Sequence, residues 1–249
     1  MPPSLINLLQ GRLVRQIVVI WNNLDEPTPA PFTSDHGVSV RYRKPERDSL
    51  NEKLRVDGDY RTQAVLLSDD DIYYRPADLE FAFQSWRQFG RHRVTGALAR
   101  CADLDADGGG WTYAPCRGDA PYSMVLTNLA FVHISFLDFY FTDDVPWLGA
   151  VRDAVDSRFN GEDIAVNYVV SLLTGNAPLL VRGSEQYVNL DPAGGISRKP
   201  GHFEARSSCL NEYADAMRCM PLVEQEARVE RGVRYNVWYK ALWDRYTLF

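Results

Sequence analysis

The stretch Ala64-Val65-Leu66-Leu67-Ser68-Asp69-Asp70-Asp71-Ile72-Tyr73-Tyr74 joins a short apolar run to three consecutive aspartates. The run is long enough for a buried strand and too short for a helix. Three adjacent carboxylates repel one another, so they face either water or a cation. One interpretation is a solvated turn, the usual place of a charge run. The other is a divalent-metal site at the carboxyl end of a strand, where α/β proteins bind ligands and where Mg²⁺ or Mn²⁺ selects carboxylate oxygens.

The composition is that of one ordinary globular domain. The chain has 249 residues, of which 45% are hydrophobic and 24% are charged, enough for a single well-packed core. The formal net charge of −6 disfavours a nucleic-acid partner. No apolar run approaches the ~20 residues of a membrane-spanning helix, and the first residues lack the pattern of a signal peptide. A complete chain of this kind would be soluble and cytosolic.

Four cysteines are present, Cys101, Cys116, Cys209 and Cys219, and none has the paired spacing of a zinc site. Their even number allows two disulfides in an oxidising compartment but does not require any.

Apolar patterns predict strands that alternate with helices, which indicates one α/β domain with a mostly parallel sheet. Residues 16–21 are expected to form a buried parallel strand, and the aspartate-rich residues 103–118 a loop or hairpin. The last third of the chain is expected to be mixed and mostly helical, with residues 223–249 as a variable extension. Further strands are expected at 38–42, 64–68, 93–99, 123–127 and 178–181, and helices at 5–13, 48–55, 76–86, 147–158 and 162–173.

A second acidic group, Glu162-Asp163, follows Asn160-Gly161 at the start of an apolar helical run. The helix dipole favours acidic residues in a first turn, so capping alone explains this pair. The other interpretation puts a carboxylate at the rim of the cleft that holds the aspartates. The basic residues that could meet a metal-bound diphosphate, although each is also explained as a surface charge, are Arg47, Lys53, Arg55, Arg198 and Lys199.

The sequence lacks a Gly-x-Ser-x-Gly elbow, a Walker loop and a Rossmann fingerprint. His133 and His202 have no metal-ligand spacing. Strand-end aspartates, a second acidic pair and scattered basic residues fit a nucleotide-sugar transferase. In such an enzyme a metal neutralises the diphosphate leaving group, and a carboxylate lies near the anomeric carbon.

Several stretches together resemble the C-terminal catalytic domain of the exostosin family, glycosyltransferase family 64. The resemblance extends from about Leu5 to Leu222. Its stretches are Ile17-Val18-Val19-Ile20-Trp21-Asn22-Asn23, Ser49-Leu50-Asn51, Ala64 to Asp71, Glu80-Phe81-Ala82-Phe83-Gln84-Ser85-Trp86, Tyr122-Ser123-Met124-Val125-Leu126-Thr127, Glu162-Asp163-Ile164-Ala165-Val166-Asn167, His202 with Arg206, Cys209-Leu210-Asn211 and Met220-Pro221-Leu222.

This resemblance implies a single-domain GT-A fold and a retaining, Mn²⁺-dependent transfer from a UDP-sugar, with UDP-N-acetylglucosamine or a related hexosamine as donor. The aspartates would form a DXD-type motif in which Asp71 is the metal ligand. The implied catalytic residues are Asp163 and Glu162, and the acceptor-side residues are Tyr122 and Ser123. The implied donor-binding residues are Asn22, Asn23, Asp48, Asn51, Lys53, Asp69, Asp70, Arg198 and Lys199.

The chain also departs from the family pattern. It begins after the family's first strand, Asp48 replaces an asparagine, and Lys53 replaces an arginine and so lacks the bidentate fork. Gly161 stands where the family has a cysteine, which leaves Cys209 without its disulfide partner. These departures support an alternative, a catalytically silent subunit that supports a partner transferase.

Family resemblance also implies a Golgi or endoplasmic reticulum location, a glycan or glycolipid acceptor, and homo- or hetero-oligomers. Gly194-Gly195-Ile196-Ser197 is closer to the pattern of the plant members, which modify glycosyl inositol phosphoceramides.

Overall fold

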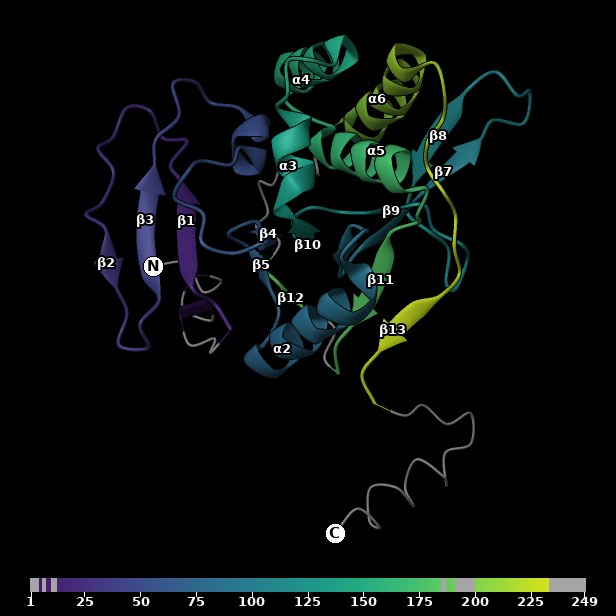
Figure 1. The fold of residues 1–249 in the computed structure, drawn as a ribbon. Coiled ribbons are helices and arrows are strands. Elements are labelled where there is room, and N and C mark those ends of the chain that lie inside the picture. Colours follow the sequence, from purple (N-terminus) through teal and green to yellow (C-terminus); the bar gives the residue numbers. More distant parts are fainter. Residues whose placement is uncertain (1–4, 6–7, 10–12, 185–186, 191–199, 233–249) are drawn as a thin grey trace, which may run out of the picture.

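The computed structural model describes residues 5, 8–9, 13–184, 187–190 and 200–232. Its central sheet has five strands in the order β13-β11-β6-β10-β4 (Figure 1). The bounds of these strands are Arg228–Glu230 for β13, Leu179–Arg182 for β11, Thr95–Gly96 for β6, Leu129–His133 for β10 and Ala64–Ser68 for β4.

This sheet is mixed, so the prediction of a mostly parallel sheet is wrong, although the α/β class is correct. Strand β11 is parallel to β6 and β13, whereas β10 is antiparallel to both β6 and β4. Parallel neighbours need a crossover connection, which is usually a helix. The chain between β6 and β10 instead folds into strands β7 (Ala99–Leu104), β8 (Trp111–Ala114) and β9 (Met124–Val125).

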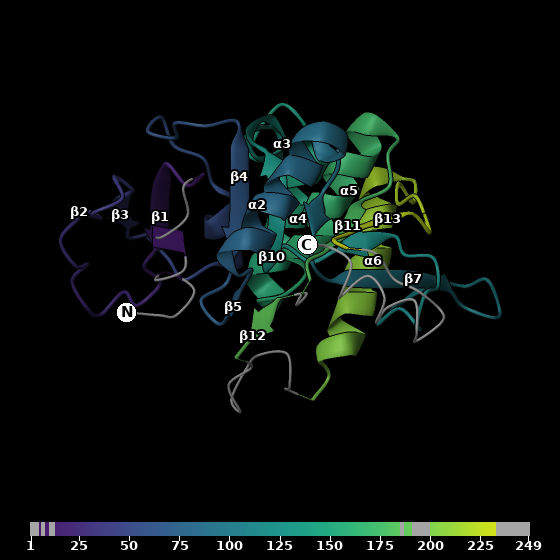
Figure 2. The same ribbon diagram turned by 90° about the horizontal axis from the view of Figure 1, so that it is seen from below.

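Helices cover both faces of the central sheet. Helix α2 (Pro76–Ser85), which continues as the π turn η2 (Trp86–Gly90), lies on one face, and the other long helices lie on the opposite face (Figures 1 and 2). The bounds of the other helices are Ile134–Tyr140 for α3, Pro146–Arg158 for α4, Glu162–Thr174 for α5 and His202–Met217 for α6.

The central sheet separates two hydrophobic clusters, and alternate side chains of β10 belong to one or the other. Ala130 and Val132 belong to the hydrophobic cluster beneath α3, α5 and α6, whereas Leu129 and Phe131 join the cluster beneath α2. Successive side chains of a strand point to opposite faces, so a strand buried on both faces reads as a continuous apolar run. The apolar run of β10 therefore contributes to both cores.

Three smaller sheets complete the fold. Strand β1 (Gln16–Ile20) is parallel to β3 (Ser39–Arg43), which also pairs with β2 (Phe32–Thr33). Strand β5 (Ile72–Tyr73) pairs with β12 (Val188–Asn189). All five residues of β1 are only half-buried, so the prediction of a buried strand there is wrong. Strands β1 and β4 each end their own sheet, and no described strand lies between them.

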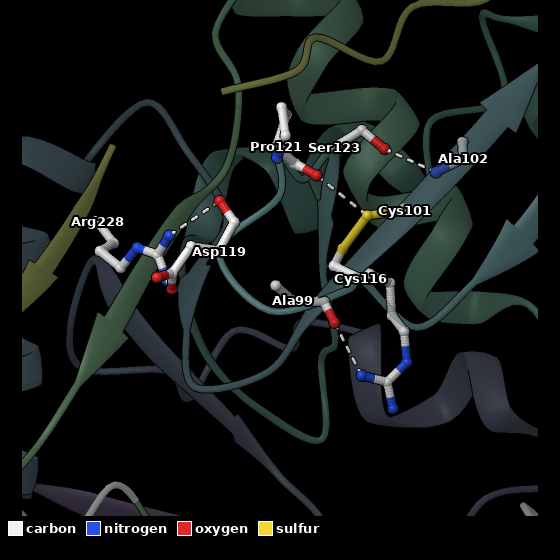
Figure 3. Close-up of a disulfide and its surroundings, with 9 residues drawn as sticks. Ala99, Cys101, Ala102, Cys116, Asp119, Pro121, Ser123 and Arg228 are labelled. Carbon is white, nitrogen blue, oxygen red and sulfur yellow. Dashed lines mark hydrogen bonds and ion pairs between the residues drawn. A yellow bond between two sulfur atoms is a disulfide. The ribbon is translucent and has the colours of Figure 1, made fainter. Parts of the chain in front are cut away.

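The aspartate-rich loop is a hairpin, as one of the two predictions had it. Strands β7 and β8 pair antiparallel, and a disulfide between Cys101 and Cys116 closes the hairpin across a Cα–Cα distance of 5.3 Å (Figure 3). Cys209 is buried and Cys219 is exposed, and both are free thiols.

Helix positions agree with the sequence where local signals are strong. The helices expected at 147–158 and 162–173 are α4 and α5, and Pro76 opens α2. Residues 48–55 form only the short 3₁₀ helix η1 (Leu50–Leu54), capped by Ser49. Of the C-terminal residues expected to be mostly helical, 209–249, residues 209–217 belong to α6, residues 218–232 contain β13 and no helix, and residues 233–249 lie outside the described residues. Within the described part of the chain, no helix has the length and apolarity needed to cross a bilayer.

Candidate active site

A cavity of about 1600 Å³ opens where β1, η1, the β4–β5 turn, the start of α5 and the start of α6 approach one another. Its lining holds charged residues from segments far apart in the sequence. Around the two acidic groups these are Lys53, Asp69, Asp70, Asp71, Glu162, Asp163 and Arg206, and five further arginines line the cavity, Arg15, Arg61, Arg87, Arg91 and Arg100. The cavity is the place where the two acidic groups of the sequence meet.

The aspartate triplet forms the turn between β4 and β5 and lines the cavity. Asp69 and Asp71 are half-buried and Asp70 is exposed. The turn is fixed by its main chain, because the Asp69 N–H donates to the Asn128 carbonyl at 2.8 Å and the Asp71 carbonyl accepts from the Leu190 N–H at 2.8 Å. The triplet is thus a turn after a strand that lines the cavity, and the metal site stays a prediction.

Lys53 bridges the two acidic groups. Its ammonium lies 3.3 Å from Asp69 Oδ1 and 3.0 Å from Glu162 Oε1. Burial alone would lower the pKa of Lys53, but the charges of Asp69 and Glu162 outweigh it and raise that pKa. Burial likewise favours neutral Glu162, yet Lys53 and Arg206 hold the pKa of Glu162 below its ordinary value. Lys53 and Glu162 therefore form a buried ion pair at neutral pH.

The pKa of Asp69 shifts in the opposite direction to that of Glu162, although both carboxylates contact Lys53. Burial raises the pKa of Asp69 above its ordinary value, and the Lys53 charge opposes this only in part. Two further carboxylates, Glu162 and Asp70, act in the same direction as burial. A cation at this end of the cavity would therefore relieve an unfavourable concentration of negative charge.

Asp163 is paired with Arg206. Both side chains are buried, at 4% and 7% exposure, and the guanidinium contacts both carboxylate oxygens, with Arg206 Nη1 lying 3.3 Å from each. Asp163 Oδ1 also accepts from the Ile164 N–H at 2.8 Å, at the start of α5. Asp163 thus accepts from one N–H in the first turn of α5, and both acidic residues lie in that turn while lining the cavity.

Arg206 was not among the residues predicted from the sequence to act in catalysis or binding. The signal was present, because His202 and Arg206 stand four residues apart and so share one face of α6. Asn160 joins them, with its amide nitrogen 3.3 Å from His202 Nδ1 and its Oδ1 3.5 Å from Arg206 Nη1.

Gly161 allows α5 and α6 to meet at this point. Its φ is +88°, and a Cβ there would lie 2.7 Å from Cys209 Sγ and 2.8 Å from the Tyr213 hydroxyl. The position therefore requires glycine while Cys209 remains a free thiol.

Other predicted donor-binding residues are not gathered in the cavity. Asn51 is buried, where its amide donates to Asp156 Oδ1 at 2.8 Å and its Oδ1 accepts from the Tyr140 hydroxyl at 2.6 Å. Asn51 thus fixes η1 against α3 and α4. Asp48 and Asn23 are exposed and lie outside the lining.

Asn22 does line the cavity, and its buried Oδ1 has no hydrogen-bond partner among the described residues. An amide oxygen in that state is available to a ligand donor. Arg198 and Lys199 lie outside the described residues.

The structure does not bring the predicted acceptor residues to the cavity. The Tyr122 hydroxyl is used within the fold, donating to the Ala227 carbonyl at 2.6 Å and accepting from the Leu180 N–H at 2.8 Å. Ser123 is buried, and its Oγ accepts from the Ala102 N–H at 3.1 Å (Figure 3). Both side chains hold strands together.

The carboxylates that line the cavity are the groups that could hold a metal ion. Among the described residues, no three His, Cys, Asp or Glu side chains are arranged to hold an ion. Mg²⁺-like cations, however, are commonly held by one or two carboxylates together with a substrate's phosphates. The carboxylates of the β4–β5 turn fit this second mode, in which a phosphate-bearing substrate completes the site.

Comparison with known proteins agrees with the resemblance found in the sequence. Residues 3–235 match the model of the glycosyl transferase family 64 domain. Exostosin-1a of Danio rerio is 32% identical over 235 residues, which cover 91% of this chain and 31% of that protein. Glucosamine inositolphosphorylceramide transferase 1 of Arabidopsis thaliana is 32% identical over 207 residues, 81% of this chain and 26% of that protein. Exostosin-2 of Mus musculus is 29% identical over 219 residues, which cover 86% of this chain and 30% of that protein. The chain therefore spans less than a third of the length of these relatives.

Proposed function

Since the chain belongs to glycosyl transferase family 64, we propose that the cavity transfers a sugar from a UDP-sugar, with retention of configuration and dependence on Mn²⁺. The proposed donor sugar is N-acetylglucosamine or a related hexosamine. Glucosamine in the name of the Arabidopsis relative supports a hexosamine donor. The proposed architecture is the GT-A fold, with the mixed central sheet described above.

One observation carries this proposal. The β4–β5 aspartates and the acidic start of α5 line the same cavity, although they are about ninety residues apart in the sequence. Asp71, with help from Asp69 and Asp70, would hold Mn²⁺ together with the donor diphosphate, and the bound metal would neutralise the leaving group. Asn22, whose Oδ1 has no hydrogen-bond partner in the described part of the chain, would meet the nucleotide.

The α5 carboxylates would act at the sugar. A glycosyl transition state carries positive charge near the anomeric carbon, and fixed negative groups stabilise it. Glu162 is held ionised by Lys53, and Asp163 is oriented by Arg206. Lys53 pairs with the carboxylates, and its contact with the donor diphosphate stays a prediction.

The acceptor would be a glycan or a glycolipid. The name of the Arabidopsis relative supports a glycolipid, an inositolphosphorylceramide. A Golgi or endoplasmic reticulum location and a homo- or hetero-oligomer with a related transferase remain part of the proposal, by family.

The first experiment measures UDP release from UDP-N-acetylglucosamine and other UDP-sugars with and without Mn²⁺, for the wild type and Asp71→Asn. We expect Mn²⁺-dependent release, and a loss of about 100-fold or more in Asp71→Asn because a metal-ligand carboxylate is removed. Asp59→Asn is the matched control, since Asp59 is exposed and lies outside the cavity lining. Turnover that is unchanged in Asp71→Asn would refute the metal assignment.

A second function is a catalytically silent subunit that supports a partner transferase. The observation that favours it is Lys53, whose ammonium contacts two carboxylates, which leaves one of its three N–H donors for a diphosphate. Calorimetric titration with UDP separates the two functions. Mn²⁺-dependent UDP binding supports the transferase, and absence of UDP binding at millimolar nucleotide supports the silent subunit.

A further inference from the structure

Arg206 holds Asp163 with a guanidinium that hydrogen bonds only partly constrain. Its Nη1 and Nη2 contact Asp163, but its buried Nε has no hydrogen-bond partner among the described residues. The guanidinium carbon Cζ lies over the ring of Tyr113, 4.8 Å from the ring centroid. Tyr113 is 4% exposed and lines the cavity. The ring therefore covers the part of Arg206 that Asp163 leaves open.

Tyr113 is itself fixed by the packing of β8 against α6. The Tyr113 N–H donates to Ser207 Oγ at 3.0 Å. Two residues earlier, Trp111 exchanges hydrogen bonds with the Asn211 side chain at 2.8 and 2.9 Å. The ring of Phe203 lies 5.8 Å from the ring of Tyr113. Strand and helix are thus tied together on both sides of the tyrosine.

The disulfide secures the same hairpin. Cys101 and Cys116 join β7 to the end of β8, and Cys101 lies next to Ala102, the register partner of Tyr113 (Figure 3). The Cys101 Sγ also lies 3.1 Å from the Pro121 carbonyl oxygen. Cys116 lies two residues beyond β8, and its covalent link to β7 opposes a slip of the two strands, so the tyrosine keeps its place over Arg206.

We infer that Tyr113 is a positioning residue, which holds the plane of the Arg206 guanidinium so that Arg206 aims the Asp163 carboxylate into the cavity. This inference rests on the proposed function, in which Asp163 acts at the sugar. An arginine that is stacked on an aromatic ring and shielded from water gains more from the contact than an exposed one. Burial and the Asp163 charge raise the pKa of Tyr113, so the ring stays neutral beside the carboxylate.

The test compares Tyr113→Phe with Tyr113→Leu in UDP release from the donor sugar. Tyr113→Phe keeps the ring, and we expect its kcat to stay within about twofold of the wild type. Tyr113→Leu loses the ring, and we expect kcat to fall about tenfold while the KM for the donor changes less than about twofold. A fall in Tyr113→Phe as large as in Tyr113→Leu, or a change confined to KM, would overturn the inference.

A double-mutant cycle tests the coupling without turnover. Thermal unfolding is measured for Tyr113→Leu, for Arg206→Met and for the double variant. If Tyr113 acts through Arg206, Tyr113→Leu lowers Tm less in the Arg206→Met background than in the wild type. Equal decreases in both backgrounds would overturn the inference. A wild type that releases no UDP would refute the proposed function, and this cycle would still decide whether Tyr113 positions Arg206.

Discussion

Lys53 has partners in the tertiary structure that its sequence neighbourhood did not predict. The sequence suggested a cation for a diphosphate, and in the structure the ammonium lies between Asp69 and Glu162 and contacts both carboxylates. Glu162 is 109 positions away in the chain, so local sequence carries no signal of the pairing. The buried Glu162 depends on this partner, because an uncompensated charge in the interior is costly.

Replacement of Lys53 by methionine should therefore destabilise the fold by about 3–5 kcal/mol at neutral pH, because Glu162 is left buried and unpaired. The folded-state pKa of Glu162 is lowered, so its favourable contribution is present above its unfolded pKa and is lost as pH falls through its folded pKa. The deficit of Lys53→Met should accordingly shrink in acid. Urea unfolding of the wild type and of Lys53→Met, near pH 7.5 and again in the acidic pH range where carboxylates titrate, measures this difference in stability.

The control is Lys44→Met, because Lys44 is exposed and donates only to the Glu26 carbonyl. It should change stability by less than about 0.5 kcal/mol. A deficit in Lys53→Met that is the same at both pH values would contradict the ion-pair account.

At the scale of elements, the β7–β8 hairpin connects local structure to the site. Its two strands are exposed at the tip but carry Tyr113 and the disulfide at the base, where β8 packs on α6. The sequence predicted a loop or hairpin here from its aspartates and glycines. It could not choose the cysteine pair, since four cysteines allow several pairings and only the strand register brings Cys101 and Cys116 together.

Removal of this disulfide in the double variant Cys101→Ala/Cys116→Ala should destabilise the protein by about 3 kcal/mol, the value expected for a loop of about 15 residues. Denaturant unfolding under non-reducing conditions measures this loss. Cys219→Ser is the control, because this exposed thiol has no partner cysteine among the described residues and should leave stability unchanged. Equal stability of the double variant and the wild type would show that the bond does not constrain the chain.

The whole molecule combines a deeply buried half with a more open one. Helix α5 is buried over its first ten residues, and β10 is buried along four of its five. The β1–β3–β2 sheet lies to one side, and its strands are mostly half-buried (Figure 2). Local opening costs least where few apolar contacts are lost. The wall of the cavity formed by β1 should therefore be less stable than the wall formed by α5.

Hydrogen exchange followed by mass spectrometry measures this difference. Amides of α5 and β10 should exchange most slowly, and those of β1 and β3 faster by about tenfold or more, since each 1.4 kcal/mol of opening free energy is tenfold in exchange. UDP with Mn²⁺ should slow exchange in both walls. Uniform protection across α5 and β1 would show that the two halves open as one unit.

The sequence alone determined the helices α4 and α5, the strand that ends at Ser68, the first-turn proline of α2 and membership of family 64. These features depend on apolar periodicity, capping and turn residues, which act within a few positions of the chain.

The tertiary structure alone decided the mixed direction of the central sheet, the Cys101–Cys116 pair and the partners of Lys53 and Arg206. It also placed Asn51 and Tyr122 in structural roles away from the cavity. Each of these outcomes depends on which distant segments pack together. Strand direction and ion pairing are set by contacts between segments, and a local pattern carries no record of them.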